Sequence, residues 1–100
     1  MSLVLSHVLQ LAGPAAELVT HCEKAWGSAN FSGQRHTIAL QFSGGPNTVH
    51  GETFIAAFPD HFFDVADTIV ADAVIIHVDR HLAPAPRTLV TVCLLTIDEA

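Results

Sequence analysis

Two histidines and an aspartate alternate near the end of an apolar stretch, in the run His77-Val78-Asp79-Arg80-His81. Side chains two residues apart on a strand point to the same side, so His77, Asp79 and His81 would form one row. Two imidazoles and one carboxylate are a ligand set that divalent transition metals use. Alternate residues of a strand lie about 6.5–7 Å apart, so the three side chains would have to lean together to bind one ion. The alternative is that the strand leaves the core here and polar residues mark its exit.

A second candidate for chemistry is an acid–imidazole pair in the aromatic-rich segment 59–64. Asp60 and Asp64 flank His61, and Phe62 and Phe63 follow it directly. A carboxylate beside an imidazole in a water-excluding pocket can perform acid–base catalysis, which makes His61 and Asp60 candidate catalytic residues. In the alternative, a phenylalanine anchors the core while Asp60 and His61 lie exposed in a turn, as polar loop residues usually do.

Other short motifs carry less chemistry. Ser43-Gly44-Gly45 precedes a possible helix and could hold an anion, but the Walker and dinucleotide-binding glycine patterns are absent, and Gly-Gly-Pro-Asn is typical of a turn. His21 and Cys22 are neighbours, which on a helix would point about 100° apart and would form no catalytic dyad. The sequence contains no G-x-S-x-G motif of a serine hydrolase.

The charges of the chain argue against several classes of partner. Ten acidic residues outweigh four basic ones, which gives a formal net charge of −6. The basic residues are scattered: Lys24, Arg35, Arg80 and Arg87. Binding of nucleic acid or of an anionic membrane surface needs clustered basic residues, so neither is expected.

The cysteines and the first residues indicate a compartment. Cys22 and Cys93 lie far apart and resemble no secreted disulfide framework, so both are predicted to be buried free thiols. The apolar segment 3–12 is interrupted by polar residues, lacks a basic start, and is too short to span a bilayer. The sequence therefore predicts a cytoplasmic protein without a signal peptide.

The first 26 residues of the chain are expected to be mainly helical. Apolar residues recur at alternating steps of four and three between Val4 and Ala25, which is typical of one helix face. Pro14 suits a first helical turn, so the pattern predicts a helix over Pro14–Trp26 that ends at Gly27. Ser2–Ala12 is left open as a short helix or a strand.

The middle of the chain predicts a strand and then a helix. Residues 28–34 form a loop, and His36–Ser43 alternates, with Ile38, Leu40 and Phe42 on the side that faces the core. Leu18 and Cys22 of the expected helix should pack on that side. After a glycine-rich turn, Thr48–Phe58 is either a strand or, as favoured here, a helix that Pro59 stops. Residues 59–67 should form a turn with aromatic anchors.

Two long apolar strands end the chain. Val70–Asp79 has Val70, Val74, Ile76 and Val78 on one face and Ala71, Ala73 and Ile75 on the other. Thr88–Ile97 is apolar on both faces, with Val90, Val92 and Leu94 opposite Leu89, Cys93, Leu95 and Ile97. Only eight residues join the two strands, so they should pair antiparallel, because a parallel crossover is longer.

Together these elements predict one α+β domain over residues 1–100. Its N-terminal helix packs on a small, mainly antiparallel sheet of three or four strands in the order α-β-α-β-β, the last two strands being a hairpin-like pair. Because one or two helices cannot cover both apolar sheet faces, a second copy of the chain is expected on one face or edge. Apolar residues make up 50% of the sequence, which favours the same conclusion.

Two functions from different classes remain open at this point. The first is a non-enzymatic homodimeric interaction protein that needs no cofactor. The second is a protein that binds a small ligand or a divalent transition metal, with or without enzymatic activity, through His77, Asp79, His81 or His61.

Overall fold

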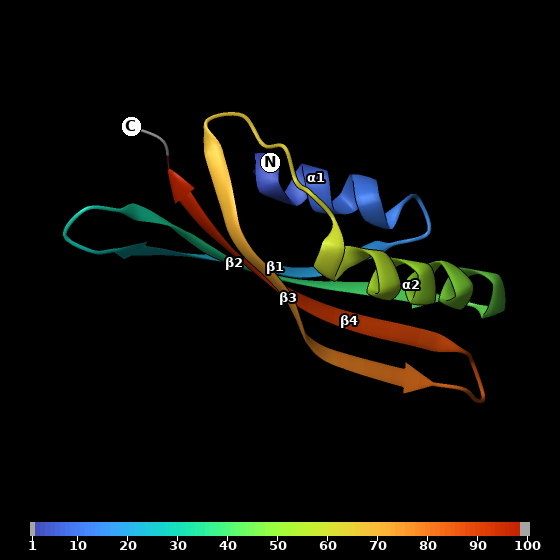
Figure 1. Ribbon diagram of the computed structural model, residues 1–100. Helices are drawn as coiled ribbons and strands as arrows, with labels where there is room; N and C mark the ends of the chain where they lie inside the picture. The colour runs from blue at the N-terminus through green and yellow to red at the C-terminus, as the bar shows by residue number, and fades with distance from the viewer. Residues whose placement is uncertain (1, 99–100) are drawn as a thin grey trace.

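A computed structural model describes residues 2–98 and shows an α+β fold, which confirms the predicted fold class. Its four strands form one antiparallel sheet in the order β1-β2-β4-β3, and both helices lie on the same face of that sheet (Figure 1). Within residues 2–98 no helix is long and apolar enough to cross a membrane. In chain order the elements are α1 (Leu3–Ala12), β1 (Glu17–Gly27), β2 (Ser32–Ser43), α2 (Gly45–Ala57), the 3-10 turn η1 (Phe58–Asp60), β3 (Thr68–His81) and β4 (Arg87–Asp98).

The predicted helix over Pro14–Trp26 is wrong, because most of this segment is strand β1. β1 and β2 form a hairpin that starts from the pair Gly27 and Ser32, so Gly27 ends a strand rather than a helix. The spacing of apolar residues favoured a helix, but these side chains of residues 17–27 do not form the buried face that a helix would have: Leu18, for example, is 43% exposed. The backbone pairing of this segment with β2 along its length outweighs the local preference for a helix.

The N-terminal helix instead covers Leu3–Ala12, which settles the open question about the first residues. The Leu5 backbone N–H donates to the Ser2 hydroxyl oxygen at 3.3 Å, so Ser2 caps the helix. Gly13, at φ +85°, ends it in a conformation that favours glycine. The preference for a helix over Thr48–Phe58 is confirmed, since α2 spans Gly45–Ala57.

The core lies between the two helices and the sheet. Ile38, Leu40 and Phe42 of β2 are fully buried, as predicted, but Leu18 and Cys22 are exposed on β1. The helix layer is supplied by other residues: Val4, Leu5, Val8 and Ala12 of α1 and Phe54 of α2, with Phe58 of η1 and Phe63 and Val65 of the following loop. In the loop that follows η1, Phe63 is buried and Phe62 is exposed.

β3 and β4 pair antiparallel, as predicted, but the predicted faces of β3 are wrong. The pairing shifts between Val70 and Asp72 and again between Ile75 and His77. Each irregularity adds a residue to β3 and reverses the alternation of its side chains. As a result Val70, Ala73, Ile75 and Val78 pack toward the core. Val74 and Ile76, which were expected beside Val70 and Val78, are exposed. For β4 both predicted faces are confirmed, since Val90, Val92 and Leu94 are buried in the core.

Candidate functional site

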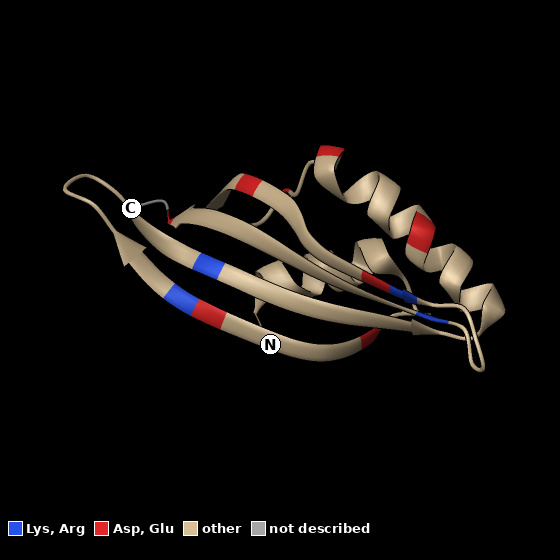
Figure 2. Cartoon of the chain, turned by 90° about the horizontal axis from the view of Figure 1, so that it is seen from below, with Lys and Arg blue, Asp and Glu red and all other residues tan. Residues whose placement is uncertain are grey.

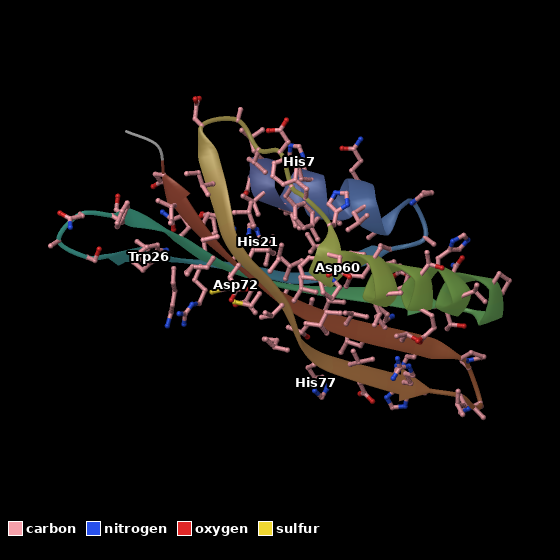
Figure 3. The ribbon with its side chains drawn as sticks, viewed as in Figure 1. His7, His21, Trp26, Asp60, Asp72 and His77 are labelled. Atoms are coloured by element: carbon pink, nitrogen blue, oxygen red, sulfur yellow. The ribbon has the colours of Figure 1, made fainter. Side chains whose placement is uncertain are left out.

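The residues His77, Asp79 and His81 lie on β3, on the side of the sheet that faces away from the helices. Figure 3 shows His77 pointing away from the helix layer. The His81 Nε2 atom lies 3.1 Å from Asp79 Oδ2, and both side chains are nearly half exposed. Among the described residues, three potential metal-donor groups lie within 4.8 Å of one another at only one place, and it does not include these residues. The structure therefore brings Asp79 and His81 together and leaves His77 outside their contact.

His61 lies exposed in the loop before β3, beside a depression of about 570 Å³ that Asp64 and Asp72 also line. Its ring meets Phe63 edge-on, with 4.6 Å between the ring centroids. Asp60 is exposed in η1, near the end of α2 (Figure 3). Within residues 2–98, no ion pair joins His61 to either flanking aspartate, so the expected acid–imidazole pair is not formed in this arrangement.

The Ser43-Gly44-Gly45 segment is the turn that leads from β2 into α2. The Gly44 N–H donates to the Pro86 carbonyl at 2.8 Å, and Gly44 adopts φ +95°. The Asn47 amide donates to the Ser43 carbonyl at 2.9 Å. These contacts use the polar groups of the turn to join β2, α2 and the start of β4, which is a structural role.

The structure assembles a different cluster of candidate ligands, formed by His21, Glu23 and His36. His21 and Glu23 are alternate residues of β1 and therefore share one side of the strand. His36 lies directly opposite Glu23 on β2. Because His21 pairs with the buried Ile38, the cluster faces the helix layer, and Figure 3 shows His21 beneath α1.

The donor atoms of this cluster converge. His21 Nε2 lies 3.1 Å from His36 Nδ1, and the two rings are nearly parallel, with 8° between their planes. Glu23 Oε1 lies 3.7 Å from each of these two nitrogens. The side chain of His36 is 4% exposed and that of His21 17%, while that of Glu23 is 42% exposed. The site is thus closed on the β2 side and open to solvent at the carboxylate.

Electrostatics favour neutral His36. Burial lowers the pKa of His36 below its ordinary value of 6.5, the nearby Glu23 carboxylate opposes this decrease, and His21 reinforces it. Asp98, at the end of β4, also raises this pKa. Neutral imidazole is the form that accepts a hydrogen bond or binds a metal at a ring nitrogen.

The sequence prediction placed the loop of this hairpin too far along the chain. A hairpin closed by the predicted loop over residues 28–34 would place Glu23 opposite Ala39, whereas β2 begins at Ser32, and the closing pair Gly27–Ser32 places Glu23 opposite His36. The prediction of a helix over Pro14–Trp26 concealed this, because residues two apart on a helix point about 200° away from each other. Strand alternation in β1 brings His21 and Glu23 to the same side.

The cysteines do not form a disulfide. Cys22 and Cys93 are both free, but Cys22 is exposed on the edge strand β1 and Cys93 is half-buried on β4. The prediction that both are buried is therefore wrong for Cys22. An edge strand leaves its side chains with neighbours on one side only.

The sheet face opposite the helices, here called the open face, is the largest feature left without a covering layer. Figure 2 shows the molecule from below: charged residues lie toward the two ends of the strands, and among the described residues the middle carries none. Pairing registers place these apolar side chains of β3 and β4 on the open face: Ile69, Val74, Leu89, Cys93, Leu95 and Ile97.

Trp26 lies at one end of the open face, over Gly33. Its indole N–H donates to the Thr96 carbonyl at 3.0 Å and so ties β1 to β4 across β2. Gly33 is required beneath it, because a Cβ atom at this position would lie 1.8 Å from the Thr96 carbonyl oxygen. The hairpin end is therefore anchored without helix cover.

Comparison with known proteins adds no relative. No family model, no curated protein and no solved structure matches the chain.

Proposed function

We propose that this chain is a non-enzymatic interaction protein that forms a homodimer by packing the open faces of two copies against each other. The observation that carries the proposal is the contrast between the two faces of β4. Val90, Val92 and Leu94 are covered by helices, while the equally apolar Leu89, Leu95 and Ile97 on the other face have no layer over them. Apolar patches of this kind mark interaction sites on soluble proteins.

The size of the open face suits a stable interface. A four-stranded sheet with strands about 4.8 Å apart and at least 11 residues long presents roughly 700 Å² per face. A standard protein interface buries about 800 Å² on each partner. The sheet is twisted, so contact over most of the face requires a partner with the same twist, which a second copy provides.

Pairing through the face is favoured over pairing through an edge. The described strand irregularities all lie in the edge strands, at Val19 of β1 and at Ala71 and Ile76 of β3. Bulges in edge strands interrupt the row of free backbone groups and obstruct the addition of another strand. The sequence left open whether the interface lies on a sheet face or a sheet edge. We therefore propose the face.

One pair of opposite charges on the open face, Lys24 and Asp72, is complementary between two copies. Lys24, Arg35, Leu95 and Asp72 follow one another across β1, β2, β4 and β3 in one row of the sheet. A two-fold axis parallel to the strands turns each row of the sheet end for end. It places Lys24 of one copy over Asp72 of the other and Arg35 over Leu95, and in a second row it places Glu17 over Asp79. Such an isologous contact closes as a dimer and does not propagate into a fibre.

Sedimentation equilibrium at micromolar concentration tests the proposal. The wild type should have about twice the 10.7 kDa mass of one chain. Cys93→Asp should be monomeric, because the interface would bury an unpaired charge. Leu82→Asp is the matched control, since Leu82 is 84% exposed in the loop after β3 and should leave the mass unchanged. Val74→Lys, at an exposed position of β3, replaces Cys93→Asp if the latter fails to fold. A monomeric wild type contradicts the proposal.

The second candidate function, binding of a ligand or metal through His77, Asp79, His81 or His61, is supported by a single contact, between Asp79 and His81. Under the dimer proposal these residues are instead polar groups at the end of the open face. A cytoplasmic location belongs to the same proposal, on the ground that both cysteines are free.

A further inference from the structure

We propose that His21, Glu23 and His36 form a binding site for a divalent transition metal ion, with Zn²⁺ as the expected occupant. The site lies on the helix-covered side of the β1–β2 hairpin, away from the open face. The inference does not rest on dimer formation and concerns residues other than the row on β3.

The separations of the donor atoms match those around a tetrahedral ion. Zinc binds imidazole nitrogen and carboxylate oxygen at about 2.0–2.2 Å, which places ligand atoms about 3.3–3.5 Å apart at tetrahedral angles. The three separations in the cluster are 3.1 Å between the two nitrogens and 3.7 Å from Glu23 Oε1 to each nitrogen. The donor separations therefore match an ion to within a few tenths of an ångström, and each imidazole ring must turn so that its nitrogen points at the ion and no longer at the other ring.

The backbone holds the three residues in this arrangement before any ion binds. His21 and Glu23 are fixed two residues apart on β1, and Glu23 and His36 are direct partners across the hairpin. Both strands are paired along this stretch, and β2 is paired on its other side with β4 as well. In the row on β3, by contrast, His77 does not join Asp79 and His81. A ligand set on paired strands loses little freedom on binding, which strengthens it.

The facing nitrogens are joined by a proton in the absence of metal, and an ion can take its place. Only one of His21 Nε2 and His36 Nδ1 can carry a proton at a separation of 3.1 Å, so without metal the two rings share one hydrogen bond. When a divalent ion binds, that proton moves to the other nitrogen of its own ring, so both facing lone pairs bind the ion and the Glu23 carboxylate beside them is neutralised. Two neutral imidazoles and a carboxylate make a net charge of +1 with Zn²⁺, as in zinc sites built on two histidines and a glutamate.

One coordination position remains for an outside ligand. Glu23 and His36 line a depression of about 250 Å³ between the sheet and the first turn of α1, which Ser2 and Thr96 also line. It is open to solvent, so a water molecule or a small oxygen ligand can reach an ion bound there. Three protein ligands with an open fourth position are typical of zinc sites that bind or activate a small molecule.

Calorimetric titration of Zn²⁺ into the chelator-treated full-length chain tests the site. The wild type should bind one ion per chain, and His21→Gln and Glu23→Gln should each weaken binding by more than about 100-fold, since even outer-sphere partners of metal ligands contribute 10–100-fold. Both residues are partly exposed, so these variants should keep the fold, which circular dichroism checks. Zn²⁺ should also raise the melting temperature of the wild type but not of the variants.

Two matched controls separate this site from the other possible ligands. The double variant His77→Ala/His81→Ala should bind Zn²⁺ as the wild type does, and so should Cys22→Ser, whose thiol lies on the opposite side of β1. Co²⁺ in place of Zn²⁺ should give the visible absorption of a tetrahedral site in both controls. No binding by the wild type, binding unchanged in His21→Gln and Glu23→Gln, or binding lost in either control overturns the assignment.

Discussion

Replacement of Leu40 by alanine tests the corrected packing of the first hairpin. Leu40 is 0% exposed in the core, and its direct partner across the hairpin, Leu18, is 43% exposed on β1. Leu40→Ala should cost about 2–5 kcal/mol, because it removes buried methyl groups and leaves a cavity. At about 3 kcal/mol and about 4–8 °C per kcal/mol, the melting temperature should fall by roughly 10–25 °C.

The same change at Leu18 is the matched control. Leu18→Ala removes the same atoms from the same row of the sheet, but from a position where solvent already reaches them. Its expected cost is below about 1 kcal/mol, since only part of the side chain leaves an apolar environment. Had residues 14–26 formed a helix on the core, Leu18→Ala would instead cost as much as Leu40→Ala.

Urea unfolding followed by circular dichroism measures both costs. All proteins are compared at one protein concentration, because association adds to the apparent stability. The midpoints should separate while the slopes stay equal, since the slope reports the surface exposed on unfolding. Equal losses for the two variants, or a larger loss for Leu18→Ala, would refute the packing described for β1 and β2.

Three further results are expected. Gly33→Ala should destabilise the fold strongly because of the clash with the Thr96 carbonyl, whereas Gly27→Ala, whose Cβ would lie 3.7 Å from its nearest neighbour, should change the melting temperature little. In metal-free protein the pKa of His36 is lower in the folded than in the unfolded chain, so the unfolded chain binds a proton more readily. The free energy of unfolding should therefore fall as the pH decreases through 6.5 and become constant below the folded-state pKa. This pH dependence should be smaller in His36→Gln. Asp72→Lys should weaken the dimer in sedimentation, and added salt should reduce that difference; an unchanged dimer would contradict the proposed two-fold axis.

Much of the fold follows from local patterns in the sequence. β2 and β4 were predictable because their alternation separates a core face from a second face and because turn residues bound them. α2 was predictable because Pro59 lies directly after a helical pattern, and the structure ends the helix at Ala57. These signals depend on residues close together in the chain.

The errors arose where long-range pairing decides the outcome. In β1 a helical apolar period coincides with a strand whose side chains are largely exposed, so the pattern carried no information about burial. In β3 the irregularities at Ala71 and Ile76 reverse the faces, and nothing in the local sequence marks them. The cluster of His21, Glu23 and His36 depends on the register of the first hairpin and was missed for the same reason.

Small-angle X-ray scattering of the wild-type protein tests self-association through the open face, because it reports mass and shape together. One chain extends over 50 × 23 × 19 Å. Packing of two open faces, with the sheets about 10 Å apart, should double the mass and the thickness while the longest dimension stays near that of one chain. A particle with the mass of one chain, or a dimer much longer or wider than one chain at unchanged thickness, would contradict self-association through the open face.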